Sequence, residues 1–181
     1  TGRINLAGCG VTNTAALAFG GRPNQAETEN WNGTNWTEVN DLNTARKKLG
    51  GAGTNTAALA FGGQPGDADT EVWNGTNWTE VNNLNTGRQM LLGATGTNTA
   101  ALAFGGSAAY PENSGSVKTE TWNGTNWSET ANLGNARYSL AGAGTNTAAL
   151  GFGGTKPGVA NVGLQTEEFS VGGGVATLDT E

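Results

Sequence analysis

The sequence has no histidine and only one cysteine, Cys9, among its 181 residues. Without histidine there is no ordinary general base, no Ser-His-Asp triad and no imidazole ligand for zinc or copper. A single cysteine also excludes a framework of disulfides within the chain and a thiolate metal cluster. We therefore predict that the chain has no metal site and no cofactor.

Charged residues and long apolar runs are scarce as well. Only 13% of the residues are charged, and nine Lys and Arg against fifteen Asp and Glu give a net charge of -6. A negatively charged chain is poorly suited to a phosphate backbone, so we predict no nucleic-acid partner. No apolar run approaches the roughly 20 residues of a bilayer-spanning helix, so we predict no membrane insertion.

The dominant feature of the sequence is repetition. The segment T-N-T-A-A-L-x-F-G-G occurs four times, starting at Thr12, Thr54, Thr97 and Thr145, at spacings of 42, 43 and 48 residues. A second block, T-E-x-W-N-G-T-N-W, follows in three copies, and a third block ends in Arg. In the fourth copy Phe169 replaces the first Trp, and Gly174 falls at the position expected for the second. The residues that recur once per copy are Arg3, Arg46, Arg88 and Arg137, Glu29, Glu71, Glu120 and Glu167, and Trp31, Trp73 and Trp122.

Each copy has the pattern of four short strands. Runs of four to six β-favouring residues are separated by Gly, Asn and Thr, and the Asn-Gly pairs suit tight hairpins. Repeated four-stranded units of about 40 to 50 residues are typical of β-propeller blades. We predict an all-β fold, a single β-propeller over residues 1–181 with four-stranded antiparallel blades at approximately 1–43, 44–85, 86–134 and 135–181. The Gly- and Ala-rich first strands should lie nearest the axis, and the Trp-bearing strands further out.

Three features in fixed order resemble kelch repeats: the double Gly after the second strand, the aromatic pair around a hairpin, and the Arg after the last strand. The resemblance covers the whole chain, although the Tyr usual in the third strand is a Trp here, or Phe169 in the last copy, and the aromatic interval is one residue shorter. Near-identical copies of this kind are also similar to kelch-like repeats of marine phage and metagenomic sequences. That similarity implies a viral or bacterial origin and an extracellular or virion-associated location. The resemblance to galactose oxidase implies no such activity here, because its copper site needs His.

Four blades are fewer than kelch propellers usually have, so three assemblies are open. The chain could close a four-bladed ring, form a larger ring as a homodimer, or be a fragment of a longer protein. Unpaired blade faces would expose Leu and Trp, and such patches normally lie in interfaces. We therefore expect an open monomer to be the least favoured state.

The residues repeated in every blade have a structural and a functional interpretation. The Arg and Glu sets could bind an anion or a sugar, but we expect bidentate ion pairs that link strands. The Trp pairs could stack on sugars, but we expect them to pack the blades together.

The connection between the second and third strands differs most between copies, and divergent loops on a rigid repeat mark a binding surface. Its most distinctive side chains are Arg22, Asp67, Asp69, Tyr110, Lys118 and Lys156. Asp67 and Asp69, with Glu71, could offer oxygen ligands to calcium, but we favour a solvated acidic loop. We predict a non-catalytic binding or structural module that presents these loops to a protein or glycan partner. The alternatives are a lectin-like, glycan-binding propeller and an enzyme without His-based chemistry.

Overall fold

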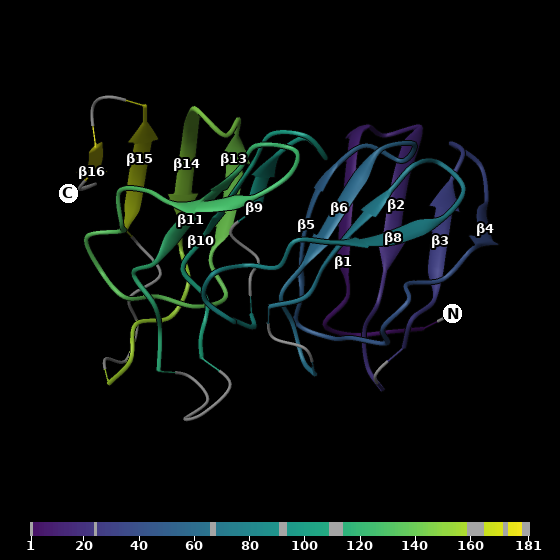
Figure 1. Ribbon diagram of the computed structural model, residues 1–181, viewed down its shortest axis with the longest axis horizontal. Coiled ribbons are helices and arrows are strands. Elements are labelled where there is room, and N and C mark those ends of the chain that lie inside the picture. The colour runs from purple at the N-terminus through teal and green to yellow at the C-terminus, as the bar shows by residue number, and fades with distance from the viewer. Residues whose placement is uncertain are drawn as a thin grey trace.

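The computed structural model describes residues 2–23, 25–65, 68–90, 94–108, 114–158, 165–171 and 174–178. These residues form sixteen strands and no helix, arranged in four antiparallel sheets of four strands each (Figure 1). The first two blades contain β1 (Ala7–Thr12), β2 (Ala15–Phe19), β3 (Thr28–Trp31) and β4 (Trp36–Val39), then β5 (Gly50–Gly53), β6 (Ala58–Phe61), β7 (Thr70–Trp73) and β8 (Trp78–Val81). The last two contain β9 (Ala94–Gly96), β10 (Ala101–Phe104), β11 (Thr119–Trp122) and β12 (Trp127–Glu129), then β13 (Ala141–Gly144), β14 (Ala148–Phe152), β15 (Thr166–Ser170) and β16 (Gly174–Leu178). The predicted fold class is confirmed: an all-β propeller of four-stranded antiparallel blades, with four blades in this chain.

Within each blade the strands follow one another in chain order as a simple meander. The hairpin between β7 and β8 shows how the sequence produces it, because Trp73 lies directly opposite Trp78. The Asn74 side chain accepts hydrogen bonds from the backbone N–H groups of Thr76 and Asn77, both at 2.9 Å. Gly75 adopts the positive φ of 94° that the turn requires and that glycine adopts without strain.

The innermost strands β1, β5, β9 and β13 line a hollow of about 220 Å³. Their Gly and Ala residues are required by the close approach of the blades. A Cβ atom on Gly51 would lie 2.7 Å from the ring of Phe19 in the preceding blade, and one on Gly142 would lie 2.6 Å from the ring of Phe104. At these positions the innermost strands have no room for a side chain, in agreement with the predicted crowding.

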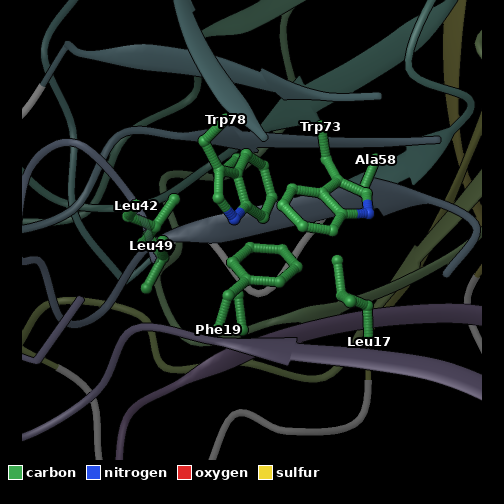
Figure 2. Close-up of a cluster of buried hydrophobic side chains, with 9 residues drawn as sticks. Leu17, Phe19, Leu42, Leu49, Ala58, Trp73 and Trp78 are labelled. Atoms are coloured by element: carbon green, nitrogen blue, oxygen red, sulfur yellow. The ribbon is translucent and has the colours of Figure 1, made fainter. Parts of the chain in front are cut away.

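Aromatic side chains fill the junction between the first and second blades (Figure 2). Phe19 of the first blade packs edge-on against Trp78 of the second, with ring centroids 4.9 Å apart. The Trp78 indole N–H also donates a 3.0 Å hydrogen bond to the Thr28 hydroxyl of the first blade. Phe61, Trp127 and Thr70 repeat both contacts one blade further on. Each of these two junctions therefore combines apolar burial with one buried hydrogen bond.

A buried arginine joins three segments within each blade. In the second blade Arg46 Nη1 donates to the carbonyl oxygens of Gly62 and Asp69, at 3.0 and 2.7 Å, and Nη2 contacts Glu71 Oε1 at 2.9 Å. The other oxygen of Glu71 accepts hydrogen bonds from the backbone and side-chain amides of Asn43, in the linker that enters the blade. We call this arrangement the arginine clamp.

The same arginine contacts recur as Arg3 with Glu29, Arg88 with Glu120 and Arg137 with Glu167. The predicted bidentate pairing is wrong, because the pair has a single contact while Nη1 binds two backbone carbonyls instead. Burial lowers the pKa of the Arg46 guanidinium, and the Glu71 carboxylate acts against that shift. An arginine remains charged under such a shift, so the clamp is a buried ion pair.

Backbone hydrogen bonds also join the linkers of successive blades. The second residue after each clamp arginine has a left-handed backbone, with φ between 55° and 59° at Asn5, Lys48, Met90 and Ser139. Lys48 N–H donates to the Asn5 carbonyl, Met90 N–H to the Lys48 carbonyl, and Ser139 N–H to the Met90 carbonyl. The linkers therefore form one continuous chain of contacts from the first blade to the fourth.

The first and fourth blades each leave one face uncovered and lie at opposite ends of the long axis in Figure 1. Trp36 is 50% exposed, whereas its equivalents Trp78 and Trp127 are 5% and 4% exposed. At the other end Phe152 is 39% exposed, whereas Phe19 is fully buried. The two end faces are thus not packed against each other, which contradicts the closed four-bladed ring among the three assemblies considered.

The clamp predicts that Arg88→Lys destabilises the fold. Lysine keeps the charge but cannot bind two carbonyls and a carboxylate in one plane, so buried acceptors lose their donors. We expect urea denaturation to show a loss of about 2 to 4 kcal/mol in the free energy of unfolding. The control is Lys118→Gln, which breaks an exposed ion pair with Glu129 and should cost less than about 1 kcal/mol. Equal stability of Arg88→Lys and the parent chain would contradict a stabilising role for the clamp.

Candidate functional site

The loops between the second and third strands of each blade lie at the same end of the sheets as the interblade linkers, at the lower side of Figure 1. In every blade the start of the loop pairs with a linker through an isolated antiparallel bridge. The bridged pairs are Ile4 with Arg22, Lys47 with Gln64, Gln89 with Ser107, and Tyr138 with Thr155. We call this surface the loop face.

Two predicted site residues lie on the loop face near these bridges. Arg22 is exposed, and its backbone N–H donates to the Ile4 carbonyl at 2.8 Å. Lys156 donates from Nζ to Asn135 Oδ1 at 3.1 Å, which ties the loop of the fourth blade to the linker entering that blade. The predicted residues Asp67 and Tyr110 lie outside the described residues.

Asp69 and Lys118 occupy the same place in two blades, immediately before β7 and β11. Asp69 Oδ1 accepts a 3.2 Å hydrogen bond from Asn83, and Lys118 Nζ lies 2.8 Å from Glu129 Oε1. Both partners belong to the same blade as the residue they bind. Among the described residues, no hydrogen bond or ion pair joins Arg22, Asp69, Lys118 and Lys156 to one another. The structure therefore distributes them over the loop face instead of forming one cluster.

The acidic residues considered as calcium ligands point to different partners. Asp69 binds Asn83, whereas Glu71 binds Arg46 within the clamp. In the part of the chain that the structure describes, no three His, Cys, Asp or Glu side chains are grouped so that they could hold a metal ion. The described residues also contain no helix long and apolar enough to span a membrane.

The tryptophans differ sharply in exposure, although their local sequences are the same. Trp73 and Trp122 are buried, and their indole N–H groups donate to the carbonyls of Asn55 and Asn98. Their ring faces are therefore not available to a sugar. Trp31 is half-buried, and Trp36 is the exposed member of the set.

Beside Trp36 lies a hollow of about 260 Å³ on the uncovered face of the first blade. It is lined by Arg3, Leu6, Ala18, Glu29 and Trp36. The Glu29 side chain is 18% exposed there, whereas Glu71 and Glu120 are fully buried. This hollow combines an aromatic ring with a charged pair, and the residue patterns did not single it out. The feature that could have indicated the hollow is the position of Trp36 in the first copy of the repeat, which has no preceding blade in this chain to cover it.

Cys9 belongs to the lining of the hollow between the innermost strands. Its thiol donates to the Thr54 carbonyl of the second blade at 3.4 Å. Burial raises the pKa of the Cys9 thiol to about 12, so the reactive thiolate is scarce at neutral pH. The hollow is otherwise lined by Gly, Ala and Thr95, which supply no further titratable group.

A small, mainly apolar cavity lies between the third and fourth blades. It is lined by Leu102, Phe104, Thr119, Leu133, Ala149, Gly151, Glu167 and Phe169. The strand register places Val175 opposite Phe169, as Trp78 stands opposite Trp73. The expectation that Gly174 takes the place of the second Trp is therefore wrong, because the turn of this blade is one residue longer. With no indole at this junction, the buried Thr119 hydroxyl has no hydrogen-bond partner among the described residues, unlike that of Thr70.

Comparisons with known proteins add no relative to this description. No protein-family model matches the chain, and no curated protein matches it at a significant level.

The unpartnered Thr119 hydroxyl predicts opposite outcomes for two matched substitutions. Thr70→Val removes the acceptor of the Trp127 indole N–H and should lower the free energy of unfolding by about 1 to 2 kcal/mol. Thr119→Val removes a buried hydroxyl that has no partner and should leave stability unchanged or increase it. Urea denaturation of both variants measures the difference. An equal decrease in the free energy of unfolding of both variants would show that the hydrogen bond from the Trp127 indole does not stabilise the fold.

The raised pKa of Cys9 predicts slow alkylation of the folded chain. Compared with a thiol at the ordinary pKa of 9.0, a pKa of about 12 lowers the thiolate fraction at pH 8 by about three orders of magnitude. We expect iodoacetamide to react slowly with the native chain, faster as the pH rises toward 12, and at the rate of a free thiol in urea. Mass spectrometry of timed samples measures the rates. Similar rates in the folded and the unfolded chain would contradict the burial of this thiol.

Proposed function

We propose that the chain is a non-catalytic binding or structural module that presents its loop face to a protein or glycan partner. The main support is the geometry of the loops. All four start at the same bridge position, yet six, six, twelve and eleven residues separate the second Gly from the third strand in successive blades. A constant base with divergent loops above it is typical of a binding surface.

The repeated polar and aromatic residues give this proposal further support, because the fold already uses them. Arg46 and Glu71 are enclosed in the clamp, and Trp73 is buried against the preceding turn. Residues bound in this way are not free to contact a ligand. The side chains that differ between blades, such as Arg22 and Lys156, remain for recognition.

We also infer that the blades are of the kelch type. The double Gly supports this assignment, since Gly62 and Gly63 both have positive φ and Gly63 N–H donates to the Arg88 carbonyl of the next blade. The resemblance to phage and metagenomic kelch-like repeats favours a viral or bacterial protein that acts outside the cell or on a virion.

A glycan-binding function is the second candidate, and one observation favours it. The hollow on the first blade places an exposed indole beside Arg3 and Glu29, and aromatic faces with charged hydrogen-bonding groups suit sugars. Unlike the loop face, this hollow occurs at one end of the array. A lectin of this kind would therefore have one site per chain.

An exchange of loops within the chain tests the proposal. In the exchange variant the long loop at 107–118 is replaced by the short loop at 64–69, and in the control the loop at 64–69 is replaced by the equally short loop at 22–27. The probes are a displayed random-peptide library and a glycan array. We expect ligands selected on the parent chain to bind the exchange variant at least about tenfold more weakly, because contacts at a few loop side chains dominate binding.

The two probes separate the candidates. Peptide ligands that depend on the long loop would support a protein partner, and glycans competed by free sugar would support the lectin. Ligands that bind the exchange variant as tightly as the parent chain would contradict a binding role for the long loop. Turnover of any ligand would contradict the non-catalytic assignment.

A further inference from the structure

The first two internal junctions are each built from two different faces. The trailing face of one blade supplies the Leu and Phe of its second strand, and the leading face of the next blade supplies two Ala and the second Trp. At the first junction the buried cluster contains Leu17 and Phe19 from one side and Ala58, Ala60 and Trp78 from the other. The second junction repeats it with Leu59, Phe61, Ala101, Ala103 and Trp127.

The trailing face of the fourth blade has the same residues but no cover. Leu150 is 40% exposed and Phe152 is 39% exposed. Their equivalents Leu17, Leu59 and Phe61 are between 0% and 1% exposed. Because the residue types are unchanged, the difference in exposure comes only from the lack of a following leading face.

The leading face of the first blade is the matching half. The hollow beside Trp36 is lined by Leu6, Ala18 and Trp36, which are the equivalents of Leu49, Ala60 and Trp78. Those three residues pack with Phe19 in one buried cluster at the first junction. The hollow therefore has the position and the lining expected of a pocket that binds the Phe side chain of a preceding blade.

Backbone groups at the two ends match as well. Inside the chain the second Gly of each blade donates to the clamp arginine of the next blade, as Gly21 N–H does to the Arg46 carbonyl at 2.8 Å. Among the described residues, neither Gly154 N–H nor the Arg3 carbonyl has a hydrogen-bond partner. The linker chain likewise ends in the Ser139 carbonyl, while Asn5 N–H begins it. The fourth blade thus offers the Gly154 N–H as a donor and the Ser139 carbonyl as an acceptor. The first blade offers the matching groups, the Arg3 carbonyl and the Asn5 N–H.

We infer that the trailing face of the fourth blade binds the leading face of the first blade in a second copy of the chain. Phe152 of one copy occupies the hollow beside Trp36 of the other, so the two copies meet head to tail through a junction like those inside the chain. A second copy is the partner that fits, because each chain carries both halves of the contact. The inference concerns the blade ends and does not depend on the proposed role of the loop face. It excludes the glycan candidate in the assembled protein, because both would occupy the hollow beside Trp36.

Native mass by light scattering coupled to size exclusion tests this assembly over a range of protein concentrations. We expect the parent chain to reach at least twice its 18.3 kDa and to dissociate on dilution. Phe152→Glu and Trp36→Glu should each weaken the association by about tenfold or more, since a charge would be buried in an apolar contact. Val11→Glu is the matched control, because Val11 is 75% exposed in β1 and is part of neither the first junction's buried cluster nor the lining of the hollow beside Trp36. It should assemble like the parent chain.

Mixing the two charged variants gives the sharper result. Phe152→Glu keeps an intact leading face and Trp36→Glu keeps an intact trailing face, so an equimolar mixture should form a one-to-one pair that neither variant forms alone. Circular dichroism melting verifies that both variants fold, and Phe152→Ala and Trp36→Ala replace them if either does not. Association that survives Trp36→Glu would overturn the inference, because it would require contact between two trailing faces. A monomer at every concentration would also overturn it.

Discussion

Each clamp arginine lies where three separate segments of chain must meet without water. Arg46 occupies this place in the second blade, where it holds the double Gly, the start of β7 and the carboxylate that binds the incoming linker. Moving a guanidinium and a carboxylate out of water costs several kcal/mol per ion, and only a nearly complete set of hydrogen bonds offsets that cost. The cost of misplacing any one segment is therefore high. This constraint positions the linker, the linker positions the next blade, and the loop face follows from both.

The fourth blade shows which parts of this arrangement the fold can lose. Its Arg137 and Glu167 remain buried and in contact, although both Trp positions of the repeat are changed. The losses fall on the junction instead, where a cavity and the unpartnered Thr119 hydroxyl replace an indole and its hydrogen bond. Aromatic packing therefore adds stability to a blade that the clamp has already organised.

The residue patterns predicted the strands and the taper of the blades because those depend on local sequence. The turn at Asn74 and Gly75 needed no knowledge of neighbouring blades, and the small residues of β5 followed from the crowding expected of an innermost strand. Exposure could not be predicted in this way. Trp36 and Trp78 follow the same Asn-Gly-Thr-Asn sequence, but the presence or absence of a preceding blade decides whether each is buried.

The position of Val175 opposite Phe169 could not be predicted either, because the fourth copy no longer has the Trp pair that marks the turn in the other copies. The left-handed residues were missed since Lys48 and Met90 have no preference for that conformation. For the candidate site, the loop position of Asp69 and Lys118 was evident, but their partners Asn83 and Glu129 on the same blade were not.

Each sheet is formed by one uninterrupted stretch of chain, without a strand borrowed from another blade. An in-frame duplication or deletion of one repeat would therefore add or remove a complete blade and leave no strand unpaired. Near-identical repeats are good substrates for such recombination within a gene. The number of loops available for recognition can thus change in single genetic steps, and each new blade brings its own clamp and its own junction faces.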